Sequence, residues 1–364
     1  MIAPDKFAGT LTSAEAVSAM SAGWAEQAPA DELVAVPMSD GGPGFVDTLH
    51  ASLGGELLAV TTAALPDWET QYDALPAAML RVEDTVYVES AHVVGLAVAS
   101  HSDPLRRSSH GVGVLLAHAI ESGARRIVVG VGGTATNDGG AGLLAALGAT
   151  AVGADLDDGP LGLKGLTDVD IDAARQVIGG IELVVATDVD SPLTGMFGAT
   201  RTYGPQKGFA DEDLPWIDAA LEAFAVLVDR KLATSPGAGA GGGIGYALML
   251  LGATRVSGID LVAEACGLDR ALTGADLVIT GEGAFDFSSR AGKVPYGVAV
   301  AAQEKAVPCV VLAGRVDIGS REMRSLGVES AYSMSELFGE AAALDHAHDT
   351  LRQLTARVAR TWSH

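Results

Sequence analysis

The chain has 364 residues, room for about two domains, and 48% of them are hydrophobic, so it can bury a sizeable core. Its 46 acidic and 23 basic residues give a formal net charge of −23. That charge argues against a nucleic-acid-binding protein, because phosphate backbones need clustered Lys and Arg. We find no signal peptide and no apolar run near the ~18 residues of a membrane span, and therefore expect a cytoplasmic protein.

Strand-like apolar runs recur along the chain, and a turn rich in Gly or Asp follows each of them. Helical patterns lie between the runs: Thr12 and Glu15 form a capping box, Ser109 can cap a helix that Gly123 ends, and Pro295 suits a first helical turn. Strands that alternate with helices predict an α/β fold with largely parallel sheets. The runs are 33–38, 126–131, 183–187, 277–280 and 309–313.

Six polar, glycine-rich segments are the candidates for chemistry, because the turns after parallel strands usually carry the site. Glycine has no Cβ, so a backbone N–H in such a turn can approach a phosphate closely, and a helix that follows adds a favourable partial charge. The alternative for any one of them is a tight turn without a ligand. The segments are 3–10, 39–44, 130–142, 186–193 with 203–208, 236–245, and 280–286 with 292–295.

The segment 130–142 fits phosphate binding well, because a strand precedes it and a helix follows it. Thr134, Thr136 and Asn137 add side-chain donors, and Asp138 is a candidate base or metal-facing carboxylate.

Basic residues are few in the glycine-rich segments, so Lys6, Lys207 and Lys293 stand out. A lysine ammonium suits a transferring phosphoryl group or a substrate carboxylate, although a solvated surface position is the alternative for each one.

Known nucleotide motifs are weak or absent. Gly237, Gly239 and Gly242 match G-x-G-x-x-G, but no strand precedes them, so we interpret the match as coincidence. It leaves a nicotinamide-dependent dehydrogenase as a remote alternative. The sequence contains neither G-x-x-x-x-G-K-[ST] nor a protein-kinase motif set.

Taken together and in this order, the segments resemble those of the type I glycerate kinase family. The specific marks are G-G-T-A-T-N-D-G-G at 132–140, G-P-Q-K-G at 204–208 and T-G-E-G at 280–283, and the resemblance covers nearly the whole chain. It implies ATP-dependent phosphorylation of D-glycerate, with Mg²⁺, to a phosphoglycerate and ADP. Of the two possible products, 2-phosphoglycerate is favoured over 3-phosphoglycerate.

The resemblance also implies two α/β domains with the active site in the cleft between them. One is flavodoxin-like (Rossmann-like), is formed by both chain ends and takes residues 1–60 and 272–364. The other is inserted and takes residues 61–271.

Phosphoryl transfer needs mainly positioning and charge neutralisation, and we assign the candidate residues on that basis. The catalytic candidates are Asp188 and Asp190, as base or metal-orienting acid, and Lys207 and Lys293, as balancing charges. For each acid the alternative is a role in capping its turn. Candidates for binding substrate or phosphate are Lys6, Gly132, Gly133, Thr134, Thr136, Asn137, Asp138, Gly281, Glu282 and Gly283. Candidate Mg²⁺ ligands, direct or through water, are Asp40, Glu282 and Asp286.

Three positions depart from the commonest family pattern. Ala8 stands where a Lys often follows the Phe, Pro43 where an acid often follows D-G-G, and Ser288 where a Gln is common. These departures leave open a kinase of another small hydroxy acid, or a non-catalytic protein that binds small anions. We expect no partner beyond the small-molecule substrates, and either a monomer or a homodimer.

Overall fold

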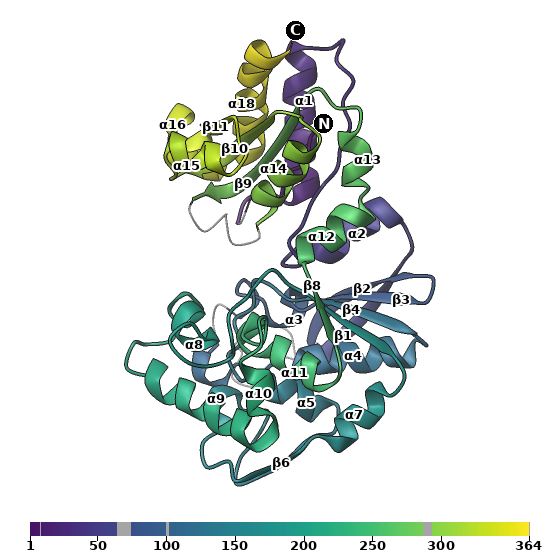
Figure 1. Cartoon of the computed structure of the whole chain (residues 1–364), viewed down its shortest axis with the longest axis vertical. Helices are drawn as coiled ribbons and strands as arrows, with labels where there is room; N and C mark the ends of the chain where they lie inside the picture. Colours follow the sequence, from purple (N-terminus) through teal and green to yellow (C-terminus); the bar gives the residue numbers. More distant parts are fainter. Residues whose placement is uncertain (8, 64–73, 100–101, 287–292, 364) are drawn as a thin grey trace. The chain divides into compact units, whose positions relative to one another are not determined.

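The computed structural model describes residues 1–7, 9–63, 74–99, 102–286 and 293–363 (Figure 1). These residues form two compact units, each built of helices and a sheet, so the predicted α/β fold class is confirmed. Unit 1 comprises Met1–Asp40, Asp47–Leu53 and Ser257–His364, and unit 2 comprises Gly41–Val46 and Gly54–Val256.

The boundaries of the two units differ from the predicted domain boundaries. The prediction placed residues 1–60 and 272–364 in one domain and residues 61–271 in the other. Strand β1 begins at Glu56 and pairs with β2 along its whole length, which places residues before 61 in unit 2. Helices α12 and α13, at Gly258–Ala265 and Leu268–Leu272, pack against α14, which places residues before 272 in unit 1.

The sheet of unit 1 has parallel strands in the order β9-β10-β11. Single parallel bridges join Ile2 to Ile279 of β9 and to Ala35, so two extended segments continue the sheet beyond β9. In chain order the five positions read 2-1-3-4-5, the flavodoxin-like order. The strands are β9 Val278–Phe285, β10 Cys309–Val316 and β11 Ser330–Ser333.

Helices cover both faces of this sheet. Ile279, Val310 and Leu312 pack against α1 and α18, which lie side by side in Figure 1. Because side chains alternate along a strand, Val311 faces the opposite side, where α14 packs on β9 and β10. The helices of unit 1, besides α12 and α13, are α1 Ser13–Gln27, α14 Val294–Glu304, α15 Ser320–Ser325, α16 Met334–Phe338, α17 Glu340–Asp345 and α18 Ala347–Trp362. Helix α2, Phe45–Leu53, begins in the residues of unit 2.

Unit 2 contains a six-stranded sheet in the order β1-β2-β3-β4-β7-β8. The β1–β2 and β2–β3 pairs are antiparallel and the others are parallel. The two short strands β5 and β6 pair separately. The strands are β1 Glu56–Ala63, β2 Ala74–Val82, β3 Thr85–Glu89, β4 Arg126–Gly130, β5 Thr150–Val152, β6 Asp168–Asp170, β7 Glu182–Ala186 and β8 Thr254–Val256.

Helices connect these strands and enclose a mainly aliphatic core. The α-helices are α3 Ala91–Val94, α4 His110–Glu121, α5 Ala141–Ala146, α6 Gly159–Gly162, α7 Asp172–Ile178, α8 Ala199–Tyr203, α9 Leu214–Val228, α10 Arg230–Ala233 and α11 Ile244–Leu250. The 3₁₀ helices are η1 Pro104–Arg106, η2 Pro205–Lys207 and η3 Ala240–Gly242.

Most of the local predictions are confirmed. Four of the five apolar runs form β4, β7, β9 and β10, and Thr12 and Glu15 make both bonds of the capping box that starts α1. The run 33–38 is confirmed in part: it pairs in parallel with residues 2–4 at the edge of the sheet, but it forms one bridge at Ala35 and no regular strand. Ser109 occupies the N-cap position of α4, as predicted, but its side chain makes no capping bond because its hydroxyl is bonded to Asp138.

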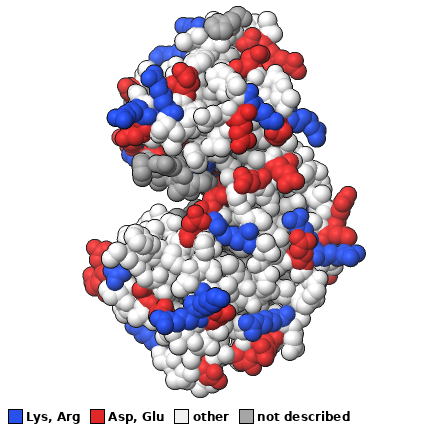
Figure 2. Space-filling model, viewed as in Figure 1, with Lys and Arg blue, Asp and Glu red and all other residues white. Residues whose placement is uncertain are grey.

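Two surface features complete the description. On the face in Figure 2, the described Lys and Arg side chains lie singly or in small groups beside Asp and Glu. Among the residues that the structure describes, no helix is long and apolar enough to cross a membrane.

Candidate functional site

The carboxyl ends of the unit 1 strands open into a pocket of about 580 Å³, within the ordinary range for small-ligand sites. Asp5 follows the bridge at Ile2, Glu282 lies in the second half of β9, and Asp40 follows the extended segment at Ala35. Ligands of open α/β sheets bind where the strand order reverses, which here lies between Ile2 and β9. The pocket therefore occupies the expected position for a ligand in this fold.

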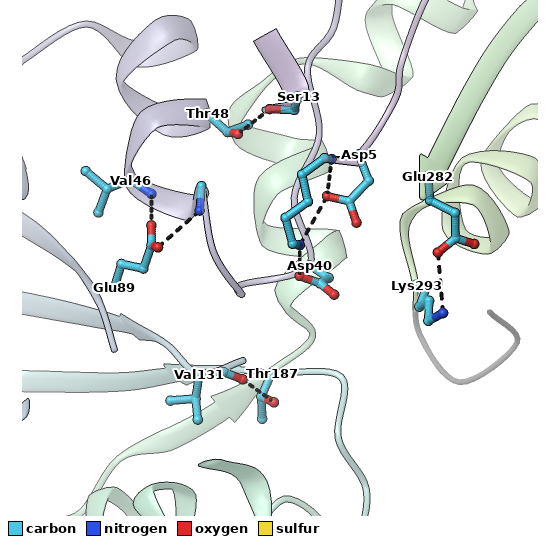
Figure 3. A network of polar contacts seen from close by, with 12 residues as sticks. Asp5, Ser13, Asp40, Val46, Thr48, Glu89, Val131, Thr187, Glu282 and Lys293 are labelled. Atoms are coloured by element: carbon cyan, nitrogen blue, oxygen red, sulfur yellow. Dashed lines mark hydrogen bonds and ion pairs between the residues drawn. The ribbon is translucent and has the colours of Figure 1, made fainter. Parts of the chain in front are cut away.

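One ion-paired group in this pocket joins Lys6 to Asp5 and Asp40, and Figure 3 labels the two acids. The Nζ of Lys6 lies 3.4 Å from Oδ1 of Asp5 and 3.3 Å from Oδ1 of Asp40. Burial raises the pKa of Asp5 to about 7, although Lys6 opposes this shift. The two carboxylates raise the pKa of Lys6 and outweigh its burial, so the lysine stays charged.

A second group is centred on Lys293, which precedes α14. Its Nζ lies 3.4 Å from Oε2 of Glu282 (Figure 3) and 3.9 Å from Oδ1 of Asp286. Glu282 is 5% exposed and Lys293 lies at the pocket wall, as does Gly283. Gly281 is buried behind it, where a Cβ would lie 2.2 Å from the carbonyl oxygen of Leu312.

The three predicted metal ligands, Asp40, Glu282 and Asp286, all belong to unit 1. Among the described residues, no group of three or more His, Cys, Asp or Glu side chains is placed to hold a metal ion. The described residues alone therefore do not bring the three carboxylates together as direct ligands of one metal ion. The pocket itself is lined by four acids and three bases, which are Asp5, Asp40, Glu282, Glu340, Lys6, Lys293 and Arg315.

The parallel strands of unit 2 end in one row, in which Glu89, Gly130, Ala186 and Val256 are register partners. The polar loops that follow therefore start at one edge of the sheet. Ser90 Oγ donates to the carbonyl of Gly130 at 2.8 Å. Thr187 Oγ1 donates to the carbonyl of Val131 at 3.0 Å, and this bond ties the loop after β7 to the loop after β4 (Figure 3).

The loop 132–140 is mostly closed to solvent. Only Gly132 and Gly133 are accessible, and the rest of the loop is buried. Gly133 has φ +62°, and a Cβ there would lie 2.7 Å from Cδ of Pro43. The predicted ligand-binding loop is therefore packed against the 41–44 turn at its start.

The segment 236–245 covers the other end of this loop, which explains its many glycines. A Cβ on Gly243 would lie 2.2 Å from Cα of Gly139, and the N–H of Gly139 donates to the carbonyl of Gly242 at 2.9 Å. Residues 240–242 form η3, and no βαβ phosphate turn surrounds the G-x-G-x-x-G match. The glycines allow two backbones to pack in contact.

Asp138 is fully buried, and its carboxylate accepts bonds from several groups of unit 2. Oδ2 accepts from the N–H and the hydroxyl of Ser109, both at 2.7 Å, and from the N–H of Gly142 at 3.2 Å. Oδ1 accepts from the N–H of Gly140 at 3.0 Å. Burial raises the pKa of Asp138 against these bonds. Its carboxylate thus fastens α4 and α5 to the loop.

The other predicted donors of this loop also have internal partners. Thr136 Oγ1 donates to the carbonyl of Gly241 at 3.2 Å, and Asn137 Nδ2 donates to Thr200 Oγ1 at 2.9 Å. Thr134 is 4% exposed and forms a bridge with Gly95. The Thr136 and Asn137 side chains and the Thr134 backbone thus help to hold the loop, and a direct contact with phosphate stays a prediction.

Lys207 ends η2 and is 4% exposed. Its Nζ donates to the carbonyl of Thr136 at 2.6 Å. Burial lowers the pKa of Lys207 to about 7, Asp138 opposes this shift and Arg107 adds to it. The buried Arg107 donates to the Lys207 carbonyl at 2.6 Å and to the hydroxyl and carbonyl of Ser102.

Asp188 and Asp190 lie on the loop after β7, as predicted. Asp188 is half-buried, whereas the Asp190 side chain is 80% exposed and its Oδ1 lies 2.7 Å from Nη2 of Arg255. The protein therefore shields the Asp188 carboxylate from water more than it shields the Asp190 carboxylate.

Sequence reasoning missed four residues of these networks: Asp5, Glu89, Arg107 and Ser109, the last of which it read as a helix cap. Asp5 stood within a candidate segment. Glu89 is 2% exposed and accepts from the N–H groups of Gly44 and Val46, at 3.1 and 3.2 Å. The sequence feature that could have identified Glu89 is an acid at the end of a strand-like run. The departures at Ala8 and Ser288 lie outside the described residues.

Comparison with known proteins gives one consistent result. Residues 1–363 match the model of the glycerate kinase family. The glycerate 2-kinase of Escherichia coli (strain K12) is 36% identical over 99% of this chain and 97% of its own, and the glycerate kinase of Bacillus subtilis (strain 168) is 34% identical over 99% and 95%. A crystal structure of a protein assigned as a glycerate kinase 2, from Salmonella typhimurium LT2, has a TM-score of 0.77 at 34% identity and covers 99% of this chain and 96% of its own.

Proposed function

The chain belongs to the glycerate kinase family, phosphotransferases that act on a hydroxyl group, and from that premise we propose that it phosphorylates D-glycerate with ATP. The products are a phosphoglycerate and ADP, with 2-phosphoglycerate favoured over 3-phosphoglycerate. We also propose that the protein is cytoplasmic. Both cysteines are free thiols, which is typical of proteins in the reducing cytoplasm.

The observation that carries the proposal is the lysine-bearing pocket at the strand-order reversal of unit 1. Lys6 and Lys293 bring two ammonium groups to it, and each is held by carboxylates at fixed positions. Charge neutralisation by fixed cations is the main requirement of phosphoryl transfer. We therefore assign the polyphosphate of ATP to this pocket.

The donor set of the pocket fits Mg²⁺. Mg²⁺ prefers oxygen ligands and binds through one or two carboxylates together with phosphate oxygens and waters, so a three-carboxylate cage is not needed. With four acids and three bases, the pocket cannot neutralise a polyphosphate without an added cation. Asp40 and Glu282 would hold the ion, with Asp286 reaching it through water. Bound there, Mg²⁺ would neutralise charge on the phosphates.

The acceptor chemistry belongs to the loop after β7. Asp188 is the proposed general base, whose carboxylate takes the proton of the glycerate hydroxyl as the phosphoryl group moves. Asp190, exposed and paired with Arg255, would orient that loop. Lys207 and the 132–140 loop would act through position, because their polar groups are mostly bonded inside unit 2.

A second candidate acceptor is supported by one position. Pro43 stands where the family often has an acid, and it packs on the accessible Gly133. Loss of that acid would alter contacts to the acceptor, so a different small hydroxy acid is the alternative substrate.

The test is a coupled ADP-release assay with ATP, Mg²⁺ and D-glycerate, run beside L-glycerate, tartronate and a no-acceptor control. We expect ADP release with D-glycerate only, and phosphorus NMR of the product should show 2-phosphoglycerate. Preference for L-glycerate or tartronate would support the alternative acceptor. No release of ADP with any of the acceptors, together with tight anion binding, would support the alternative of a non-catalytic protein that binds small anions.

A further inference from the structure

The strand-end pocket of unit 1 has two chemically different ends, because its lining follows the order of the strands. Lys6, Asp5 and Asp40 lie at the end formed by the extended segments, and Glu282 follows on β9. Next come Arg315, on β10 and ion-paired with Asp317, and Ser335, just after β11. At ~4.8 Å between neighbouring strands, the five positions span roughly 19 Å.

The far end is completed by one face of α17. Glu340, Ala343 and Leu344 all line the pocket, and their i, i+3, i+4 spacing puts them on one side of that helix. Ala343 belongs to the unit 1 core, and Thr350 Oγ1 of α18 donates to the carbonyl of Ala342 at 2.9 Å. The helix is therefore held in place, so its face is a fixed wall.

This wall differs in chemistry from the lysine end. Leu344 is 57% exposed, which is unusual for a large aliphatic side chain and means that it offers apolar surface to the pocket. Glu340 is also exposed, one turn away on the same face. A carboxylate only accepts hydrogen bonds, so it selects a ligand group that donates.

We infer that the α17 face binds the base of the nucleotide, with adenine lying on Ala343 and Leu344 and its amino group donating to Glu340. The inference rests on the proposed function, since ATP is the molecule whose phosphates occupy the lysine end. It makes Glu340 a specificity residue. A 6-oxo purine such as hypoxanthine would place an acceptor against this carboxylate, and two acceptors facing each other are unfavourable.

The experiment compares the binding of ADP, IDP and 2′-deoxyADP, each with Mg²⁺, by isothermal titration, and the KM values for ATP and ITP. It uses the wild-type chain, Glu340→Gln and Leu344→Ser, with Asp345→Asn as a matched control. Asp345 is an exposed acid on the same helix that does not line the pocket. In the wild type we expect ADP to bind at least about tenfold more tightly than IDP.

Glu340→Gln should bring the ADP-to-IDP ratio to within about threefold, because an amide can both donate and accept. Leu344→Ser should weaken both nucleotides by a similar factor, and Asp345→Asn should change neither. An unchanged ratio in Glu340→Gln would overturn the inference. So would a variant that loses discrimination against 2′-deoxyADP instead, which would place Glu340 at the ribose. A wild type that releases no ADP with any acceptor would refute the proposed function and not this assignment, which the titrations test separately.

Discussion

In unit 1 the charged side chains at the strand ends face a pocket, whereas in unit 2 most polar groups of the corresponding loops are buried and bonded to backbone. Lys6 and Lys293 are held by carboxylates at the pocket wall. Lys207 and Asp138 instead bond to loop and helix atoms of their own unit. The difference teaches that similar polar, glycine-rich segments can line an open pocket in one unit and hold buried loops in place in the other.

The largest expected effect belongs to the exception in unit 2, the half-buried Asp188. Asp188→Asn should lower kcat by roughly 10²–10⁴-fold, the usual contribution of a general base, while the melting temperature stays close to that of the wild type. The measurement is steady-state ADP release.

Asp190→Asn is its matched control on the same loop, and should lower kcat by less than about tenfold because Asp190 is exposed. Equal losses in the two variants would remove Asp188 from its special role, and full activity of Asp188→Asn would remove it from the mechanism.

The next effect concerns stability. Asp138→Ala should lower the free energy of unfolding by about 3 kcal/mol or more, because it leaves buried donors of Ser109, Gly140 and Gly142 without their acceptor. Denaturant titration measures it. The surface variant Asp190→Asn should change stability by less than about 0.5 kcal/mol. If Asp138→Ala unfolds like the wild type but loses activity, the residue contacts substrate and the comparison between the units fails.

The pH dependence of stability should differ in sign between the two units. The folded-state pKa of Asp5 is raised to about 7, so the unfolded chain loses that proton first and stability falls as pH rises from about 4 to 7. The pKa of Lys207 is lowered to about 7, so the unfolded chain binds the proton more tightly and stability falls as pH drops from about 10.5 to 7.

Melting temperatures across pH 4–10 test both signs. Asp5→Asn should flatten the profile below pH 7, and Lys207→Met should flatten it above pH 7. Profiles parallel to the wild type in either variant would show that burial of that group does not govern its protonation.

The smallest effect is expected at Glu89, which holds the 41–46 turn. Glu89→Gln should lower the free energy of unfolding by about 1–2 kcal/mol. One backbone N–H that now donates to a carboxylate oxygen would instead face the amide NH₂ of Gln, so that two donors would meet. Glu182→Gln, an exposed pair with Arg126, is the control and should be near neutral in the same thermal unfolding experiment. Loss of stability in the control alone would contradict this account of the turn.

The sequence predicted what depends on local pattern. The capping box at Thr12, the strand runs of β4, β7, β9 and β10, and the position of polar turns at strand ends all follow from short-range spacing. The run at 33–38 pairs with residues 2–4 without forming a regular strand. Ser109 makes no capping bond because a tertiary partner, Asp138, takes its hydroxyl.

Burial of the 132–140 loop could not be predicted, because it depends on segments far away in the chain. The glycines of 236–245 approach Gly139 across about a hundred residues, and Pro43 covers Gly133. Local pattern favoured an open phosphate loop, whereas the packing leaves little of it accessible. The acids Asp5 and Glu89 were missed for the same reason, since their importance lies in long-range partners.

The most direct test of the central claim is the affinity for Mg·ADP of the wild type, Lys293→Met and Asp188→Asn, measured by isothermal titration. We predict that Lys293→Met weakens binding roughly tenfold, because it removes a fixed cation from the pocket, while Asp188→Asn leaves the affinity unchanged. Weaker binding in Asp188→Asn, with no change in Lys293→Met, would place the nucleotide on unit 2 and contradict the account.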